Sequence, residues 1–247
     1  MSRIFFGINY EFDKAVVIKR IAEQVATDEA AYICVADGVV LNTAQREPEY
    51  REIVNGSVFS VCDSSYVPLY ILWIYGLRYG QYAGSDLFMD IVREKRYKQF
   101  FLGTKENILS GLKQTLSVID PGIGDMTFYA PPYCAVEDFD YHDIAMKIKS
   151  SEADIIWIAL GAPKQEIFMN RLKPLLRCGV MISVGAVFKF YSGIEVRRAP
   201  KWIVSWHLEF VWRIVSEPRK QIKRCAMIIQ ALPGMLWRET QHKNKNH

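Results

Sequence analysis

The chain has 247 residues, of which 50% are hydrophobic, 23% are charged and 13% are aromatic. This composition excludes collagen-like, low-complexity and disordered proteins, and the length allows a large buried core without disulfides or structural metals. The five cysteines are widely spaced and form no CxxC motif or Cys/His cluster. They therefore argue against a disulfide framework and a zinc site, and they favour the reducing cytoplasm.

Positive charge is concentrated at the C-terminal end. The formal net charge is +4, yet residues 197–247 alone contain 11 Lys/Arg and 3 Asp/Glu. At the other end, residues 1–10 carry Arg3 and run directly into Glu11 and Asp13. No basic region followed by an apolar h-region opens the chain, so we expect no signal peptide. The longest nearly uncharged apolar stretch, residues 66–77, has 12 residues. A membrane-spanning helix needs roughly 20, so we expect no membrane span.

Short β-branched or aromatic runs alternate with helical patterns along most of the chain. We expect strands at residues 32–41, 58–62, 99–102, 126–129, 155–160 and 180–184. We expect helices at residues 14–26, 86–96, 105–118, 142–150 and 163–176, where apolar residues recur at spacings of three and four. This order predicts an α/β fold with a Rossmann-like, doubly wound, mostly parallel sheet. The strands read as continuous apolar runs, which is typical of a sheet covered by helices on both faces.

The C-terminal part has a different character. Residues 202–237 predict two or three helices, broken at Pro218 and at Pro233-Gly234. We therefore predict an α/β domain over residues 1–198 and a basic amphipathic helical appendage over residues 199–247. Its basic residues interleave with long aliphatic ones, as in helices that lie on anionic membranes; the alternative is a basic helix packed on its own domain. No stacking aromatics or base-reading motif accompany the charge, so we expect no nucleic-acid partner.

The junctions between strands and helices are the first place to look for a site, because ligands of open α/β sheets bind beyond the carboxyl ends of the strands. The clearest junction is residues 157–166, where an apolar strand ends at Gly161 and Pro163 suits the first helical turn. Lys164, Gln165 and Glu166 then stand at a ligand-facing helix start. Ordinary stabilisation of a helix N-terminus is the alternative interpretation.

Two further junctions carry carboxylates. Asp63 ends a short apolar strand and is a candidate general base. From the residues alone, a cap of a helix that starts near residue 65 is the favoured interpretation. In the third junction Gly84 permits a tight turn, and Asp86 either caps a helix or contacts a ligand.

Other patterns favour structure over chemistry. Residues 122–124 read Gly-Ile-Gly, but they lack a third glycine and precede a strand, so they indicate a turn and not a dinucleotide site. Asp138 and Asp140 resemble a metal-binding pair, whereas the spacing of Asp140 and Asp143 is typical of a helix cap. The chain lacks GxxxxGK[ST], GxSxG and HExxH motifs. We therefore expect no metal and no cofactor.

Taken together and in order, the junctions resemble the WecG/TagA/CpsF family of bacterial glycosyltransferases. The resemblance spans residues 41–224. It rests on Leu41-Asn42, Asp63, Ala83-Gly84-Ser85-Asp86-Leu87, Phe101-Leu102-Gly103, Leu160-Gly161-Ala162-Pro163-Lys164-Gln165-Glu166, Val184-Gly185-Ala186, Gly193, Arg198-Ala199-Pro200, Leu208-Glu209, Arg213 and Glu217-Pro218.

The resemblance implies a catalytic α/β domain and an inverting glycosyl transfer. The sugar, of the N-acetylmannosamine type or a related hexose, would move from a UDP-sugar to a polyprenyl-diphosphate-linked sugar acceptor in cell-surface polysaccharide or teichoic acid linkage-unit synthesis. The enzyme would be cytoplasmic, peripheral on the anionic inner face of the plasma membrane, and independent of metal. The family's base is an aspartate in a strand-end Asp-Gly pair, and order along the chain assigns it to Asp63. Asp37-Gly38 looks similar but precedes Asn42, so we interpret it as a turn at or near the start of a strand.

The resemblance also implies roles for other residues. Substrate-binding residues would be Asn42, Gly84, Asp86, Gly103, Gly161, Pro163, Lys164, Gln165, Glu166, Gly185 and Arg198. The appendage would serve as a membrane anchor and an active-site lid, with Arg213, Lys220 and Lys223 on the diphosphates of donor or lipid acceptor. Three positions depart from the family pattern, namely Ser64, Gln81 and Lys189. They leave open a second hypothesis, a non-catalytic nucleotide-sugar-binding or scaffold protein of a polysaccharide assembly complex.

Overall fold

The computed structural model describes residues 3–194 and 218–245, with only the helical backbone described for residues 218–229 and 245. An eight-stranded sheet has the order β1-β2-β4-β3-β8-β7-β5-β6. The strands are β1 (Arg3–Phe5), β2 (Ile8–Glu11), β3 (Ala31–Ala36), β4 (Ser60–Cys62), β5 (Gln99–Gly103), β6 (Thr127–Tyr129), β7 (Ile155–Ala159) and β8 (Val180–Ser183). Only the edge pair β1-β2 is antiparallel. This confirms the predicted α/β fold with a mostly parallel sheet.

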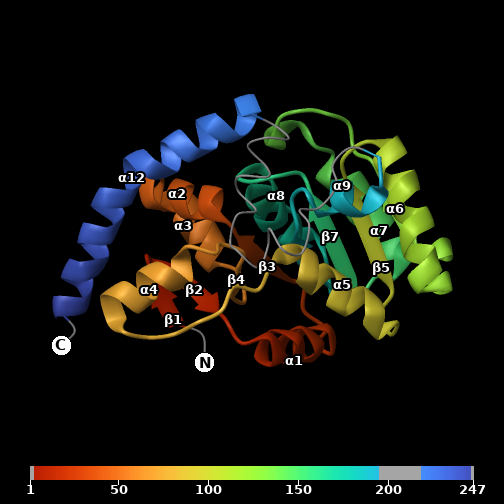
Figure 1. Ribbon diagram of the computed structural model, residues 1–247. Helices are drawn as coiled ribbons and strands as arrows, with labels where there is room; N and C mark the ends of the chain where they lie inside the picture. The colour runs from red at the N-terminus through yellow and green to blue at the C-terminus, as the bar shows by residue number, and fades with distance from the viewer. Residues whose placement is uncertain (1–2, 195–217, 246–247) are drawn as a thin grey trace.

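Helices cover both faces of the sheet and form two cores (Figure 1). The first core takes side chains from α2 (Gly38–Arg46), α3 (Pro48–Asn55), α4 (Val67–Tyr75), α7 (Tyr141–Ser151), α8 (Lys164–Leu172) and α12 (Pro218–Lys245). The second takes them from α1 (Lys14–Val25), α5 (Gly84–Glu94), α6 (Glu106–Ile119) and α9 (Val187–Ser192).

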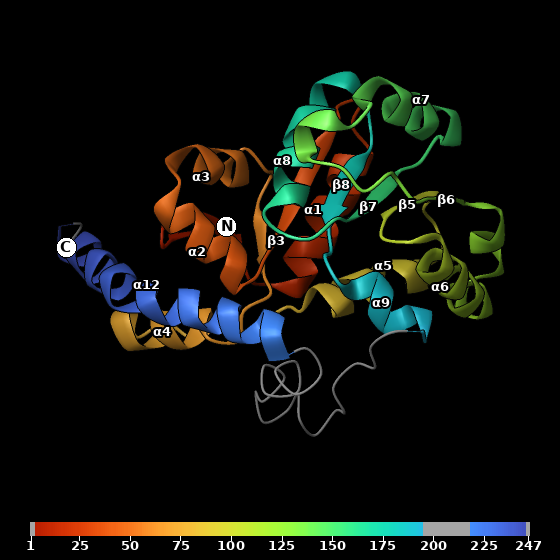
Figure 2. The ribbon, with the colours of Figure 1, turned by 90° about the horizontal axis from the view of Figure 1, so that it is seen from above.

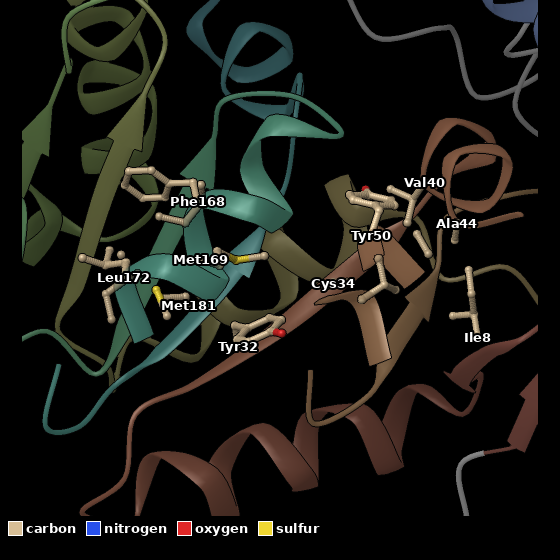
Figure 3. Close-up of a cluster of buried hydrophobic side chains, with 14 of the residues drawn as sticks. Ile8, Tyr32, Cys34, Val40, Ala44, Tyr50, Phe168, Met169, Leu172 and Met181 are labelled. Carbon is tan, nitrogen blue, oxygen red and sulfur yellow. The ribbon is translucent and has the colours of Figure 1, made fainter. Parts of the chain in front are cut away.

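The central strands alternate between the two cores. In β3, Tyr32 and Cys34 belong to the first core, whereas Ile33 and Val35 belong to the second. Figure 3 shows Tyr32 in the first core together with side chains of α8 and α3. Because helices cover each face of the sheet, both sets of side chains are buried. This burial stabilises the fold by about 25 cal/mol per Å² of apolar area removed from water. This explains why β3 and β7 are apolar at every position rather than at every second one.

We predicted a strand over residues 32–41, and its C-terminal end was placed too late. It ends at Ala36, and residues 38–46 form α2. The side chain of Asp37 accepts hydrogen bonds from the backbone N–H groups of Val39 (2.8 Å) and Val40 (3.0 Å), so it is the N-cap of α2. The cap starts a helix inside a run of apolar residues that reads as strand. Asp37-Gly38 therefore ends a strand and does not start one.

The C-terminal prediction needs a second correction. Helix α12 runs through Pro233 without the expected break, and Pro218 is its first residue. Leu232, Met235 and Leu236 pack against the first core, while Pro233 itself is exposed. A proline facing solvent removes one intrahelical hydrogen bond, and tertiary packing on both sides of it maintains the helix.

Helix α12 lies beside α2 and α4 (Figure 2). The Tyr75 hydroxyl at the end of α4 donates to Glu239 Oε1 (2.8 Å), and Arg238 Nη2 donates to Gln45 Oε1 of α2 (3.4 Å). The predicted boundary between residues 198 and 199 lies outside the described residues. The described part of the appendage, however, shares a core with the α/β domain.

Candidate active site

Two carboxylates follow neighbouring parallel strands at the same edge of the sheet. Strand β3 pairs with β4 so that Ala36 lies opposite Cys62, and the next residues are Asp37 and Asp63. The backbone N–H of Asp63 still donates to the carbonyl of Ala36 (3.1 Å). Both aspartates are half-buried. The carboxyl ends of these strands therefore bring an acidic pair to the edge where α/β proteins bind ligands.

Asp63 is held by the segment that leads into α5. Its Oδ1 accepts a hydrogen bond from the N–H of Gly84, the first residue of α5 (2.9 Å). Its backbone carbonyl accepts from Gln81 Nε2 (2.8 Å). The positive end of a helix favours a negative charge at this position. Thus Gln81, one of the departures from the family pattern, orients the backbone of Asp63.

The capping alternative for Asp63 is wrong. Helix α4 begins at Val67, and Ser64 Oγ accepts the N–H groups of Tyr66 (3.3 Å) and Val67 (3.4 Å). Ser64, which replaces the glycine usual in the family, therefore has a local structural role. Asp63 is left to contact α5.

Gly84 is at this position because no larger residue fits. A Cβ atom built on it would lie 2.8 Å from Val35 Cγ1, so α5 could not start so close to β3. Asp86 lies in the first turn of α5 and is half-buried. It is not the cap of that helix, because the N-cap residue is Ala83.

The junction after β7 is closed by buried hydrogen bonds. Gln165 Oε1 accepts from the N–H groups of Gly161 (3.0 Å) and Gly185 (3.1 Å), which belong to the loops after β7 and β8. Gln165 Nε2 donates to Glu166 Oε1 (2.8 Å), and the Tyr50 hydroxyl donates to Glu166 Oε2 (2.9 Å). Both side chains at the start of α8 are buried. They connect two loops and α3 through hydrogen bonds within the protein.

Burial also changes the titration of this junction. Desolvation raises the pKa of the Glu166 carboxyl from 4.5 to about 7, although the hydrogen bonds from Gln165 and Tyr50 favour the ionised form. Glu166 is fully buried. Its position is therefore that of a support for the loops around this junction.

Gly103, Gly161 and Gly185 all have positive φ at the ends of their strands. Gly103 is the most constrained, because a Cβ atom there would lie 2.6 Å from the carbonyl oxygen of Ala159. The peptide bond before Pro163 is cis. Lys164 donates to the carbonyl of Cys134, and its ammonium lies 4.5 Å from the ring centre of Phe139. These residues shape the loops that surround the carboxyl ends of β5, β7 and β8.

The remaining predicted residues fall in other places. Asn42 is within α2 and not at a strand end; it is buried, and its Oδ1 has no hydrogen-bond partner among the described residues. Arg198 and Arg213 lie outside the described residues. Lys220 and Lys223 are in the first part of α12, residues 218–229, where only the backbone is described.

The Asp140/Asp143 pair and the Gly-Ile-Gly stretch, which we interpreted as structural, have structural roles. Asp140 Oδ1 accepts the N–H of Asp143 (2.9 Å) and caps α7, as expected. The Gly-Ile-Gly stretch forms a 3₁₀ turn, Pro121–Asp125, before β6. Across the described ranges, no three His, Cys, Asp or Glu side chains are grouped so as to hold a metal ion. Sequence analysis did not place Asp37 beside Asp63, and the signal for it was an Asp-Gly pair directly after an apolar run.

The sequence model of the family described as "Glycosyl transferase WecG/TagA/CpsF family" matches residues 5–246. The chain belongs to this family. It is 27% identical over 196 residues to a protein of Bacillus spizizenii, covering 78% of this chain and 74% of that relative. It is 28% identical over 201 residues to a protein of Bacillus subtilis strain 168, covering 77% of this chain and 76% of that relative. Both relatives are named N-acetylglucosaminyldiphosphoundecaprenol N-acetyl-beta-D-mannosaminyltransferase.

Membership in the family confirms the resemblance seen in the sequence. The chain is a glycosyltransferase of cell-surface polysaccharide biosynthesis. Within the part of the chain that the structure describes, no helix has the length and hydropathy to span a bilayer.

Proposed function

We propose that this enzyme transfers a sugar of the N-acetylmannosamine type from a UDP-sugar to a polyprenyl-diphosphate-linked N-acetylglucosamine. The relatives' names support the sugar and the acceptor. The observation that carries the proposal is the position of Asp63, a half-buried carboxylate fixed at the carboxyl end of β4 by the first N–H of α5. A fixed carboxylate at that edge of the sheet has the reach and chemistry of a general base.

The reaction would be a single displacement. Asp63 takes the proton from the acceptor hydroxyl as that oxygen attacks the anomeric carbon of the donor. The bond between the anomeric carbon and the UDP oxygen breaks, UDP leaves with the bonding electrons, and the configuration inverts. General-base assistance of this kind contributes about 10²- to 10⁴-fold in rate.

The donor would lie across the loops that follow β5, β7 and β8. Gly103, Gly161 and Gly185 allow close approach to the backbone, with Pro163 and Lys164 beside them. Gln165 and Glu166 act indirectly, because they set the distance between two of these loops. Gly84 and Asp86 would face the donor from the side of Asp63.

The diphosphate charge would be met by basic residues without a metal or another cofactor. Lys164 is the described candidate, and Arg198, Arg213, Lys220 and Lys223 are the candidates from the C-terminal part. Preorganised donors lower a barrier most where water is excluded, which is why the appendage would also act as a lid.

We place the enzyme in the cytoplasm, on the inner face of the plasma membrane. Helix α12 supports this placement, because it carries seven Lys/Arg and one Asp/Glu and is fixed to the α/β domain through α2 and α4. An anionic leaflet attracts such a segment with about 1 kcal/mol per nearby basic residue.

The test is a transfer assay with purified full-length protein. A panel of UDP-sugars is incubated with a lipid-diphosphate N-acetylglucosamine acceptor after prolonged treatment with EDTA, and products are identified by mass spectrometry. We expect UDP release and one added N-acetylhexosamine with UDP-N-acetylmannosamine. Binding of the UDP-sugar without product would instead support the scaffold hypothesis. A stringent Mn²⁺ requirement would contradict metal independence and return attention to Asp138 and Asp140.

A further inference from the structure

Helix α4 is apolar on both of its faces. Val67, Ile71 and Ile74 are buried in the first core. On the opposite side Leu69, Leu72 and Trp73 are 51%, 39% and 74% exposed. A helix that is hydrophobic all round is normally buried on all sides or in contact with lipid. The residues that the structure describes, however, cover α4 on one side only. Its exposed apolar face is therefore a candidate surface for binding lipid or another protein.

Leu77, two residues past the end of α4, is a further apolar residue that is 36% exposed. No charged residue occurs between residues 66 and 77, and the next residue, Arg78, is basic and exposed. A stretch of this length is too short to cross a bilayer and has the length of an interfacial segment. We call Leu69, Leu72, Trp73 and Leu77 the α4 face.

The charge beside the α4 face indicates which partner fits. Helix α12 runs alongside α4 in Figures 1 and 2 and contacts it. Its one acidic residue, Glu239, is buried and accepts the Tyr75 hydroxyl. Lys243 Nζ donates to the carbonyl of Ile74, which brings a cation to the end of α4. An apolar stripe with a tryptophan, next to a basic helix, matches the acyl and headgroup layers of an anionic membrane.

We propose that the α4 face inserts into the headgroup and acyl boundary of an anionic lipid leaflet, with Lys243 of α12 at the headgroups. Helix α4 starts four residues after Asp63 in the chain. Insertion would thus hold the end of β4 close to the leaflet that contains a polyprenyl-linked acceptor. This role in bringing the site to its acceptor rests on the proposed function, whereas the lipid contact itself does not.

The test compares two double variants of the full-length chain. Leu69→Glu/Trp73→Glu places charge on the α4 face. Val118→Glu/Met146→Glu is the matched control, because these residues are 86% and 61% exposed on α6 and α7. Binding is measured by co-sedimentation with vesicles of phosphatidylcholine and phosphatidylglycerol. We expect partitioning of the first variant to fall about tenfold or more, while the control binds like the wild type.

A second measurement uses the wild-type fold. Brominated lipids should quench part of the tryptophan fluorescence of the wild type, and Trp73→Phe should lose that quenched part. Equal partitioning of all variants, or quenching that is unchanged by Trp73→Phe, would overturn the proposal. So would a wild-type dimer that the Leu69→Glu/Trp73→Glu variant converts to a monomer without a change in vesicle binding, because the α4 face would then be a protein interface.

Activity separates this proposal from the proposed function. On a short-chain, water-soluble acceptor the Leu69→Glu/Trp73→Glu variant should turn over like the wild type, and on a long-chain acceptor in vesicles it should be about tenfold slower or worse. If the wild type transfers no sugar to either acceptor, the proposed function fails. The vesicle-binding result still decides the lipid contact.

Discussion

Two junctions at the same edge of the sheet use their polar residues in opposite ways. After β7, Gln165 and Glu166 are buried, and their hydrogen bonds go to Gly161, Gly185 and Tyr50. After β4, Asp63 is half-buried, and the N–H of Gly84 holds one of its carboxylate oxygens. The first junction is closed, and the second remains partly open to solvent. A polar residue at a strand end thus becomes a candidate for chemistry only when burial and partners leave it accessible.

The close approach of β5 to β7, beside the closed junction, should make this edge of the sheet the most sensitive to changes in backbone space. Gly103→Ala would place a Cβ atom 2.6 Å from the carbonyl oxygen of Ala159, at a φ of +128°. We expect a loss of about 3 kcal/mol in the free energy of unfolding, measured by urea denaturation.

Gly161→Ala is the matched control for this change. Its φ is +80°, but among the described residues no atom other than those of its chain neighbours lies within 4 Å of the added Cβ. We expect a loss of about 1 kcal/mol from the left-handed backbone alone. Equal losses in the two variants would show that the close approach of β5 to β7 does not constrain this edge.

The buried carboxyl of the closed junction should make stability depend on pH. The pKa of Glu166 is raised in the folded chain, so its contribution is fully present below the unfolded pKa of 4.5 and is lost as the pH rises through about 7. This difference in pKa corresponds to at most about 3 kcal/mol.

Glu166→Gln keeps the volume and has no charge. Urea denaturation between about pH 4.5 and pH 8 should show that the wild type loses stability relative to this variant as the pH rises. If the difference in the free energy of unfolding stayed constant across that range, ionisation of Glu166 would not destabilise the folded chain, and the prediction would be wrong.

The smallest effect should come from the open junction. Ser64→Gly restores the residue usual in the family and removes two long hydrogen bonds, to the N–H groups of Tyr66 and Val67. We expect a loss of less than about 1 kcal/mol in stability and little change in turnover, because Gly84 and Gln81 still hold Asp63. A large fall in turnover would show that Ser64, and not the segment before α5, positions the carboxylate.

Sequence patterns predicted the central sheet well, because buried parallel strands are continuous apolar runs bounded by polar turns. They failed at β3, where Val39, Val40 and Leu41 prolong the apolar run and the capping side chain of Asp37 nevertheless starts a helix. The short N-terminal hairpin and the helices α2 and α3 were also missed. Helix length and capping compete with hydropathy at these points, and one sequence does not show which prevails.

The candidate site was predictable only in part. The order of the junctions located Asp63 and the glycines at the strand ends. The inward direction of Gln165 and Glu166 depends on Gly185 and Tyr50, which are 20 and 116 residues away in the chain. Contacts of that kind follow from the packed fold and have no local pattern. The same holds for the exposed side of α4, since its sequence is apolar on both faces.

The most direct test of this account compares Asp63→Asn with Asp37→Asn, because the two aspartates follow neighbouring strands at one edge. In the transfer assay we predict that Asp63→Asn lowers kcat by about 10³-fold, while its affinity for the UDP-sugar stays close to that of the wild type. Asp37→Asn should retain most of its turnover, because asparagine is also a good helix cap. Full turnover by Asp63→Asn, or a loss confined to Asp37→Asn, would contradict the assignment of the base.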